Sequence, residues 1–426
     1  MQLQNSIYSF ADINVGIVTF LFVAGLLLYP ITAFSQSADS LKADSEDPNT
    51  VPYKTERSIG QHILAIPSYL LHWVSRPVGY GVKYAEDNFP HWFKGERGPY
   101  GFLPLIEIGG EEDFAAGALL YHDHLFFKDH RARAEILFGS KVYNEFELQY
   151  RIPVKGVPNS SLTFDGEYEN APERAYYAGN RNEELSYASE FGSIEVNYQQ
   201  QINSWIETRV YAGYRDRTIK TSRYKNDADE QIPSVLLGNT KLFSVGSQWT
   251  FNHKNGRKRT LSGTQYVVGG NWTQSTETYS LGFLEYYGEI HHFLPVPILP
   301  KTRRLGVKLQ LHKQENMASR SIPFYELNSL GGTHDLRGFP SNRFRAQGTL
   351  QLTAEYRYPI WDFLDMVIFV DEGQPFNRYG DLSLDGFRSS YGFGFHLLSD
   401  NGLAFRSEFA FSNEGGRLII SITPNF

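Results

Sequence analysis

The sequence of 426 residues contains no cysteine and only 3 methionines. The absence of cysteine excludes disulfide bonds, thiol nucleophiles and zinc sites with cysteine ligands. The formal net charge is −7, and a nucleic-acid partner requires a basic face, so we expect no such partner. After residue 28 no segment is apolar for long enough to form a spanning helix. Any later crossing of a membrane must therefore be made by strands.

Aromatic residues are abundant in this chain, although its average composition is polar. They make up 15% of the sequence, with 31 Phe and 27 Tyr, whereas the mean hydropathy is −0.38. This combination is unusual for a soluble enzyme. It is typical of a transmembrane β-barrel, which has a water-facing interior, polar loops and belts of aromatic side chains at both membrane interfaces.

The N-terminal region carries one apolar run, from Val15 to Leu28, and small residues follow it at Ala33 and Ser35. A run of this length is short for a spanning helix and suits the core of a signal peptide. We therefore expect a signal peptide over residues 1–35. An uncleaved helical anchor stays open as the alternative, because the first fourteen residues contain no Lys or Arg.

Residues 36–98 differ from both the apolar run before them and the strand-like region after them. The segment begins as a polar stretch, and Ile59, Ile63 and Leu70 then recur with helical spacing. This pattern predicts a periplasmic leader with short amphipathic helices, which lie in the periplasm or inside the barrel lumen. A helical cap over the lower end of the barrel is the alternative.

Residues 99–426 consist of alternating apolar and polar runs bounded by turn residues. This pattern predicts an all-β fold, a transmembrane antiparallel β-barrel of about sixteen strands. Long polar connections at 170–190, 215–239, 314–347 and 374–389 alternate with short turns, as in outer-membrane barrels. Strands are expected over 101–109, 114–124, 131–138, 144–152, 160–168, 191–201, 206–214, 241–252, 261–273, 280–293, 303–313, 348–358, 364–371, 390–397, 402–411 and 417–426.

The sequence ends on an aromatic residue, Phe426, directly after a run that alternates apolar and polar residues. Leu418, Ile420 and Ile422 share one face with Phe426, and mostly polar side chains share the other. In a barrel strand one face meets lipid and the other meets a polar lumen. The run therefore predicts a last barrel strand in contact with lipid of the outer membrane of a Gram-negative bacterium.

Two short motifs lie in the last third of the barrel region. The connection at 314–347 contains LRGF at residues 336–339, and the thirteenth expected strand contains FVDEG at residues 369–373. These segments resemble the two signatures of the Omp85 superfamily, a (V/I)RG(F/Y) tetrapeptide at the tip of the sixth outer loop and an F-x-D-x-G strand motif. Leu336 departs from the first place of the tetrapeptide, whereas the order, spacing and strand numbers of the motifs agree.

The resemblance implies a specific contact inside the barrel. In this superfamily the sixth loop folds back into the lumen, and its Arg meets the carboxylate of the strand motif. Arg337 is therefore expected to pair with Asp371, with Gly338 and Phe339 beside it at the loop tip. The alternative is that Arg337 lies in an ordinary solvated loop.

The alternation of side chains along the strands gives independent support for this contact. It points Phe369, Asp371 and Gly373 into the lumen. Glu355, which faces inward on the neighbouring strand, is a second candidate acceptor for the donors of Arg337. Glycines such as Gly373 would leave room for the loop backbone to approach the wall.

The second working part that the resemblance implies is a seam between the first and last strands, where the wall can open sideways. Pro424 and Phe426 lie in the last strand, and Pro104 lies in the first. Proline lacks the N–H group that a strand ladder requires, so prolines in both strands are consistent with a loosened seam. The alternative is that both prolines lie beyond the paired region.

The resemblance implies a function but leaves alternatives open. Many members carry periplasmic POTRA modules, and residues 36–98 are too few and too helical in pattern for one, so we expect a POTRA-less member. Such a barrel would assist insertion or translocation of proteins, or lipids, through the seam. Unfolded outer-membrane protein clients and periplasmic or lipoprotein partners would fit this role. A porin-like or structural barrel with a plugged lumen is the alternative, since fold alone does not fix function.

We found no motif for catalysis or for a cofactor. The sequence contains no G-x-S-x-G, no H-E-x-x-H and no phosphate-binding glycine loop, so we expect neither an enzyme nor a cofactor. His122 and His124 would share a strand face, and His291 and His292 are adjacent, as metal ligands can be. Both pairs fall at predicted strand ends, where histidine is common at the membrane interface, and we predict no metal site.

Overall fold

The structure is a computed structural model that describes residues 99–110, 113–177, 184–224, 231–255, 262–277, 280–296, 303–361, 363–399 and 402–422. The expected signal peptide over residues 1–35 and the leader over residues 36–98, with its helices, lie outside the described residues. Pro424 and Phe426 lie outside them as well.

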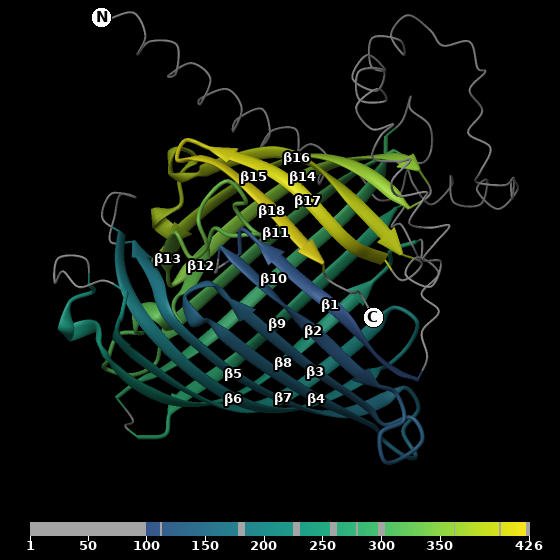
Figure 1. The fold of residues 1–426 in the computed structure, drawn as a ribbon, viewed down its shortest axis with the longest axis horizontal. Coiled ribbons are helices and arrows are strands. Elements are labelled where there is room, and N and C mark those ends of the chain that lie inside the picture. Colours follow the sequence, from purple (N-terminus) through teal and green to yellow (C-terminus); the bar gives the residue numbers. More distant parts are fainter. Residues whose placement is uncertain are drawn as a thin grey trace, which may run out of the picture.

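The described residues form a closed antiparallel β-barrel of sixteen strands, which confirms the expected fold (Figure 1). Around the barrel, hydrogen-bonded strands follow one another in the order β1-β18-β17-β16-β15-β14-β11-β10-β9-β8-β7-β6-β5-β4-β3-β2. β12 and β13 pair separately as a two-stranded sheet. The strands are β1 (Tyr100–Ile108), β2 (Phe114–His122), β3 (Arg131–Gly139), β4 (Asn144–Pro153), β5 (Ser160–Tyr177), β6 (Glu184–Gln201), β7 (Ile206–Thr221), β8 (Gly238–Asn252), β9 (Gly263–Ser275), β10 (Gly282–Pro295), β11 (Arg304–Asn316), β12 (Asn328–Leu330), β13 (Phe344–Ala346), β14 (Gly348–Trp361), β15 (Leu364–Phe376), β16 (Arg388–Ser399), β17 (Gly402–Ser412) and β18 (Gly415–Ile422).

Helical structure within the described residues is limited to short 3-10 turns in the connections. These are η3 (Ser140–Val142), η6 (Ser234–Leu236), η7 (Phe324–Glu326), η8 (Tyr379–Asp381) and η9 (Leu384–Gly386). In this part of the chain, no helix has the length and apolar character needed to cross a membrane.

Along much of the wall, apolar side chains point outward and polar side chains point inward. On β14, the hydroxyl of Thr353 donates a hydrogen bond of 3.0 Å to Asp371 inside the barrel. Large apolar side chains stay exposed on the outer surface of the wall, among them Phe102, Phe138, Leu148, Ile194, Val210 and Tyr391. A soluble protein rarely exposes so much apolar surface, and a barrel in lipid requires it.

The wall is much taller on one side than on the other. β5 and β6 contain 18 residues each, whereas β1 contains 9 and β18 contains 8. At about 3.3 Å per residue, the longest strands exceed the thickness of about 30 Å of a hydrocarbon core. They therefore continue well beyond the lipid on the side that carries the long connections, which we call the loop end.

The expectation of a long loop over residues 170–190 was wrong. β5 continues to Tyr177 and β6 starts at Glu184, so most of that segment is strand. Charged side chains form ion pairs on these extensions, along β5 between Arg174 and Glu169 and between neighbouring strands from Lys220 on β7 to Glu190 on β6. Outside lipid both faces of a strand meet water, so the alternation that marks a membrane strand disappears.

The seam between β1 and β18 is the least paired junction of the described barrel. β1 pairs with β2 along its whole length, from Tyr100 to Ile108. Within the described residues β1 pairs with β18 only through Glu107 with Ser421 and Ile108 with Ile420. Pro104 lies opposite Ala118 of β2, away from these two pairs.

Candidate functional site

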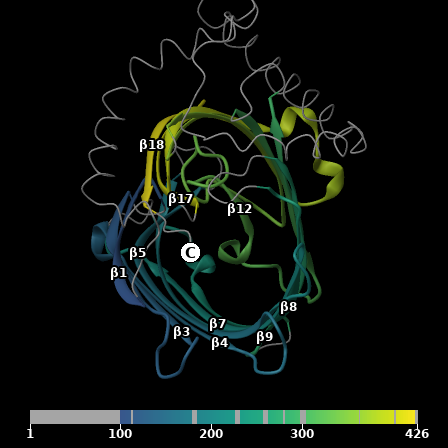
Figure 2. The same ribbon diagram turned by 90° about the vertical axis from the view of Figure 1, so that its right-hand side faces the viewer.

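The connection between β11 and β14, which we call loop 6 (residues 317–347), folds into the barrel. Figure 2 looks along the barrel and shows β12 inside the ring of strands. The loop has its own small core, in which Leu330, Leu336 and Phe339 are buried and pack with Phe344. Gly331 adopts a φ of +106° beside the carbonyl of Pro340, a conformation that favours glycine.

Loop 6 crosses the lumen and contacts walls on both sides. Near its start, Phe324 is buried with Tyr187 of β6 and Ile219 of β7. Glu326 accepts two hydrogen bonds, of 3.1 and 2.9 Å, from the guanidinium of Arg215 on β7. The tip of the loop lies against the wall made by β15 to β18, where Arg337 is buried. The loop therefore occupies the barrel interior rather than extending from its rim.

Arg337 and Asp371 are joined by a forked ion pair. Nε of Arg337 donates to Oδ2 of Asp371 at 3.0 Å, and Nη2 donates to Oδ1 at 2.8 Å. The backbone N–H of Arg337 and the hydroxyls of Thr353 and Ser390 donate to the same carboxylate. Asp371 is 0% exposed, so these donors replace the water that it loses. Two parallel N–H···O bonds fix the orientation of the loop tip as well as its distance from the barrel wall.

Two further carboxylates complete the surroundings of the guanidinium. Nη1 of Arg337 donates to Glu355 at 3.3 Å and to Glu408 at 3.1 Å. The guanidinium also stacks on the ring of Phe369, 3.3 Å from its centroid. Burial by itself would lower the pKa of Arg337, but Asp371 first, and then Glu408 and Glu355, raise it above its ordinary value. The guanidinium therefore stays charged in the lumen.

The charges in this buried cluster balance. Glu355 also contacts Arg357, and Glu408 contacts His396 at 2.7 Å and Arg406 at 3.9 Å. Three guanidinium groups thus face three carboxylates, which lowers the cost of burying them. The guanidinium and carboxylate members are Arg337, Arg357, Arg406, Asp371, Glu355 and Glu408.

Glycines allow the loop backbone to approach the wall. A Cβ on Gly338 would lie 2.5 Å from the carbonyl oxygen of Phe411 and 2.8 Å from Cβ of Ser390. A Cβ on Gly373 would lie 3.0 Å from the side chain of Leu336. That contact is tight, but the leucine side chain is flexible. The close approach at Gly338 leaves no space for any side chain.

The structure brings together the residues that the two motifs and the inward strand faces pointed to. Arg337, Gly338, Phe339, Phe369, Asp371, Gly373 and Glu355 all lie in or against this cluster. Glu408, His396 and Ser390 also belong to the cluster but lie outside both motifs. Glu408 meets a loop 71 residues away in the chain, and no local signal in its strand indicates this contact.

The histidine pairs flagged in the sequence lie apart from this cluster. His124 and His122 make local contacts in the turn after β2, where the backbone N–H of His124 donates to Nδ1 of His122. His291 contacts Glu289, whereas His292 contacts Thr264. The two groups of three metal-type ligands in the described residues are Glu355, His396 and Glu408, and Glu145, Glu147 and Glu167. Arg337 contacts two members of the first group, which opposes binding of a cation there.

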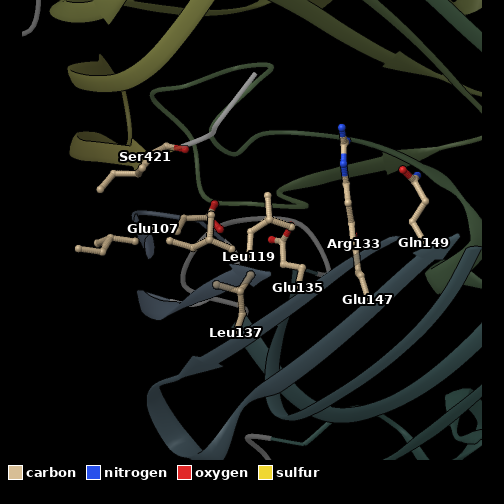
Figure 3. A pocket seen from close by; sticks show the side chains of 11 residues that line it. Glu107, Leu119, Arg133, Glu135, Leu137, Glu147, Gln149 and Ser421 are labelled. Carbon is tan, nitrogen blue, oxygen red and sulfur yellow. The ribbon is translucent and has the colours of Figure 1, made fainter. Parts of the chain in front are cut away.

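A cavity of about 240 Å³ lies on the inner wall beside the seam (Figure 3). Leu105, Leu119 and Leu137 form an apolar cluster on the first three strands and line it. Acidic side chains surround this apolar floor, together with Arg133, Gln149 and Ser421 of the last strand. The acidic residues are Glu107, Glu135 and Glu147. An apolar surface is unusual on the inner face of a barrel, which is normally polar.

These observations define a closed outer-membrane type of β-barrel whose sixth loop is folded into the lumen and contacts a buried cluster of charges. Residues 128–416 match the sequence profile described as the Omp85 superfamily domain, and the chain belongs to the Omp85 superfamily. The superfamily and the barrel point to an outer membrane. The described residues contain the barrel and its connections, and no POTRA module lies among them.

Solved structures of several proteins share this fold. BamA from Haemophilus ducreyi lacking POTRA domains 1–3 superposes with a TM-score of 0.59 at 14% identity, over 77% of this chain and 70% of that chain. CdiB from Escherichia coli gives a TM-score of 0.53 at 12% identity, over 77% of this chain and 63% of that one. CdiB from Acinetobacter baumannii gives 0.50 at 12% identity, over 76% and 59%. This chain therefore spans less than two thirds of either CdiB chain. No curated protein sequence matches it.

Proposed function

We propose that this protein assists the insertion or translocation of proteins, or lipids, at the outer membrane of a Gram-negative bacterium, through the seam between β1 and β18. The observation that carries the proposal is the buried cluster around Arg337 and Asp371, which attaches loop 6 to β14, β15 and β17, and β17 is the neighbour of the closing strand β18. Membership of the Omp85 superfamily supports it, since the resemblance of the motifs implied this role. The proposed function contains no catalytic step.

The seam has the features that a lateral opening requires. Two residue pairs of the described strands join β1 to β18, so parting them breaks few ladder hydrogen bonds. An incoming strand could then satisfy the freed N–H and C=O groups, as strands added to an open sheet edge do. Unfolded outer-membrane protein clients present such strands. Partners in the periplasm, including lipoproteins, would deliver them, and residues 36–98 are the candidate segment for that contact.

The test is the folding rate of a small client barrel in liposomes that contain this protein. We expect the wild-type protein to accelerate client folding and Arg337→Ala to lose most of the acceleration, because the loop is then released from the wall. Arg215→Ala is the matched control, since it removes a contact of the same loop to β7, far from the seam. Circular dichroism must show that every variant is folded. No acceleration by folded wild-type protein would refute the proposal.

A plugged structural or porin-like barrel is the second candidate function. The observation in its favour is that loop 6 crosses the lumen and contacts both β7 and β15. In that case the protein would leave client folding unchanged. Asp371→Ala would release the loop and raise the ion conductance of the barrel in planar bilayers. Conductance that rises without any effect on client folding would favour this candidate over the first.

A further inference from the structure

The tip of loop 6 is attached to the last strands of the barrel as well as to Asp371. The hydroxyl of Ser412, at the end of β17, donates to the carbonyl of Gly338 at 2.8 Å. Arg343 forms an ion pair of 2.8 Å with Glu414 in the turn between β17 and β18. Beneath the cluster, Ile419 of β18 is 0% exposed and packs with Phe369 of β15. Loop 6 is thus in direct contact with the strand that closes the barrel.

One side chain of the closing strand contacts both the loop and the first strand. The guanidinium of Arg417 on β18 donates through Nη1 to the carbonyl of Phe339 in loop 6. Through Nη2 it donates to the carbonyl of Gly109, directly after β1, at 2.6 Å. Arg417 therefore bridges the seam at its loop end while holding the loop tip.

The backbone at Gly109 shows how closely the two strands approach there. Gly109 has a φ of +77°, and a Cβ at this position would lie 2.3 Å from the carbonyl oxygen of Leu418. Only glycine fits this conformation and this gap. The position of the Gly109 carbonyl, and so its bond to Arg417, depends on the seam being closed.

The geometry of arginine links the two bonds. A guanidinium is rigid and planar, so an acceptor held by Nη1 fixes the direction in which Nη2 points. When Phe339 is seated, Nη2 of Arg417 is aimed at Gly109. When the loop tip leaves, the guanidinium loses the acceptor that fixed it, and the bond across the seam weakens. Only two described ladder pairs close this junction. One additional charge-assisted hydrogen bond therefore contributes a large part of the interaction between β1 and β18.

We propose that Arg417 couples loop 6 to the seam, so that the loop end of the seam stays closed only while the loop tip is seated. The coupling works in both directions, as linkage requires: opening the seam removes Gly109 from Arg417 and loosens the tip. Arg417 is a positioning residue. The inference rests on the proposed function, in that an opening seam is the movement that Arg417 regulates.

The experiment measures seam opening by the distance between two spin labels. Phe114 on β2 and Phe409 on β17 flank the seam and are exposed on the outer surface, and the chain has no native cysteine to interfere with labelling at these positions. The doubly labelled protein is reconstituted in liposomes as wild type, Arg337→Ala, Arg417→Gln and the combination of the two. Arg215→Gln is the control, because it also removes an inward arginine that contacts loop 6, but on β7.

We expect a single short distance in the wild type and in Arg215→Gln. Arg337→Ala and Arg417→Gln should each add a longer-distance population, and the double variant should show no more of it than Arg417→Gln alone. Additive populations, or an unchanged distance in Arg417→Gln, would overturn the coupling. Arg417→Lys tests the fork itself, since one ammonium group keeps the charge but cannot span both acceptors. Wild-type distances in that variant would also contradict the inference.

The two proposals fail in different ways. If the distances follow this pattern while wild-type protein does not accelerate client folding, the coupling by Arg417 stands and the proposed function falls. If wild-type protein accelerates client folding but the spin-label distances do not change in the Arg417 variants, only the coupling is refuted. The lysine variant also serves if Arg417→Gln does not fold.

Discussion

Arg337 of loop 6 and Asp371 of β15 are 34 residues apart and share two short hydrogen bonds inside the barrel, of 3.0 and 2.8 Å. The pair is the centre of a charge cluster in which five hydrogen bonds converge on one carboxylate. A loop that could lie in water is thereby attached to the wall at one defined point.

Removal of the carboxylate should destabilise the barrel strongly. Asp371→Ala removes the main partner of Arg337, and breaking a buried ion pair costs about 3–5 kcal/mol. We expect a lower midpoint in denaturant unfolding, followed by tryptophan fluorescence in detergent micelles. Arg337→Lys is the comparison, because it keeps the charge but loses the forked pair of hydrogen bonds. Its unfolding midpoint should lie between those of wild type and Asp371→Ala. Equal midpoints for wild type and Asp371→Ala would contradict the buried pair.

A methyl group at the loop tip should prevent the loop from seating. In Gly338→Ala the new Cβ would meet the backbone of Phe411, which cannot move without distorting β17. We expect faster protease cleavage within loop 6 of the folded barrel, measured by mass spectrometry of the fragments. Gly380→Ala is the matched control, since nothing lies within 4 Å of its added Cβ. A cleavage rate for Gly338→Ala equal to that of the control would show that the close approach does not hold in solution.

Acidification should loosen loop 6 through His334. The side chain of His334 is exposed, yet partial desolvation first, and then the charges of Arg406 and Lys308, lower its pKa to about 4. The unfolded chain binds this proton near pH 6.5 and the folded barrel only near pH 4. Stability therefore falls as the pH drops between these values, and is regained above pH 6.5.

The measurement is the unfolding midpoint of wild type and His334→Gln at a series of pH values from 7.5 to 4. Many other groups titrate in this range, so the difference between the two proteins isolates the contribution of His334. We expect the wild type to lose more stability than His334→Gln on acidification. Parallel curves would mean that the environment of His334 in the folded barrel does not disfavour its charged form.

A second buried ion pair should stabilise the barrel without affecting the loop. Arg304 at the start of β11 donates to Asp365 at the start of β15 at 2.7 Å, and both side chains are 1% exposed. Asp365→Ala should lower the unfolding midpoint by about as much as Asp371→Ala, since each change leaves a buried arginine. It should leave protease cleavage of loop 6 at the wild-type rate. Faster cleavage in Asp365→Ala would show that the two ion pairs are not independent.

The strands were predictable because their signal is local. Alternation with period two and the turn residues between runs located all sixteen barrel strands, with β14 expected over 348–358 and found from Gly348 to Trp361. The ends were less predictable where strands leave the lipid. β5 continues to Tyr177, and β6 already begins at Glu184. Cross-strand hydrogen bonds continue there, but no apolar face indicates a strand in the sequence.

The two motifs predicted the centre of the site, but not everything around it. Arg337, Asp371 and Glu355 could be named from the sequence because their strands and faces could be assigned. Glu408 lies in neither motif, and its contact with Arg337 depends on how far the strands are shifted along one another. That register is a property of the closed barrel rather than of any one strand.

The sequence by itself determined which segments become strands and which side chains face the lumen, since both follow from local alternation and the pleat of each strand. Only the tertiary structure decided which of the inward charges meet. Closure of the barrel brings Arg417 to Gly109 across 308 residues, and the path of loop 6 brings Phe339 to the same guanidinium. Contacts over such separations depend on strand register, closure and loop path together, and no local pattern in the chain encodes all three.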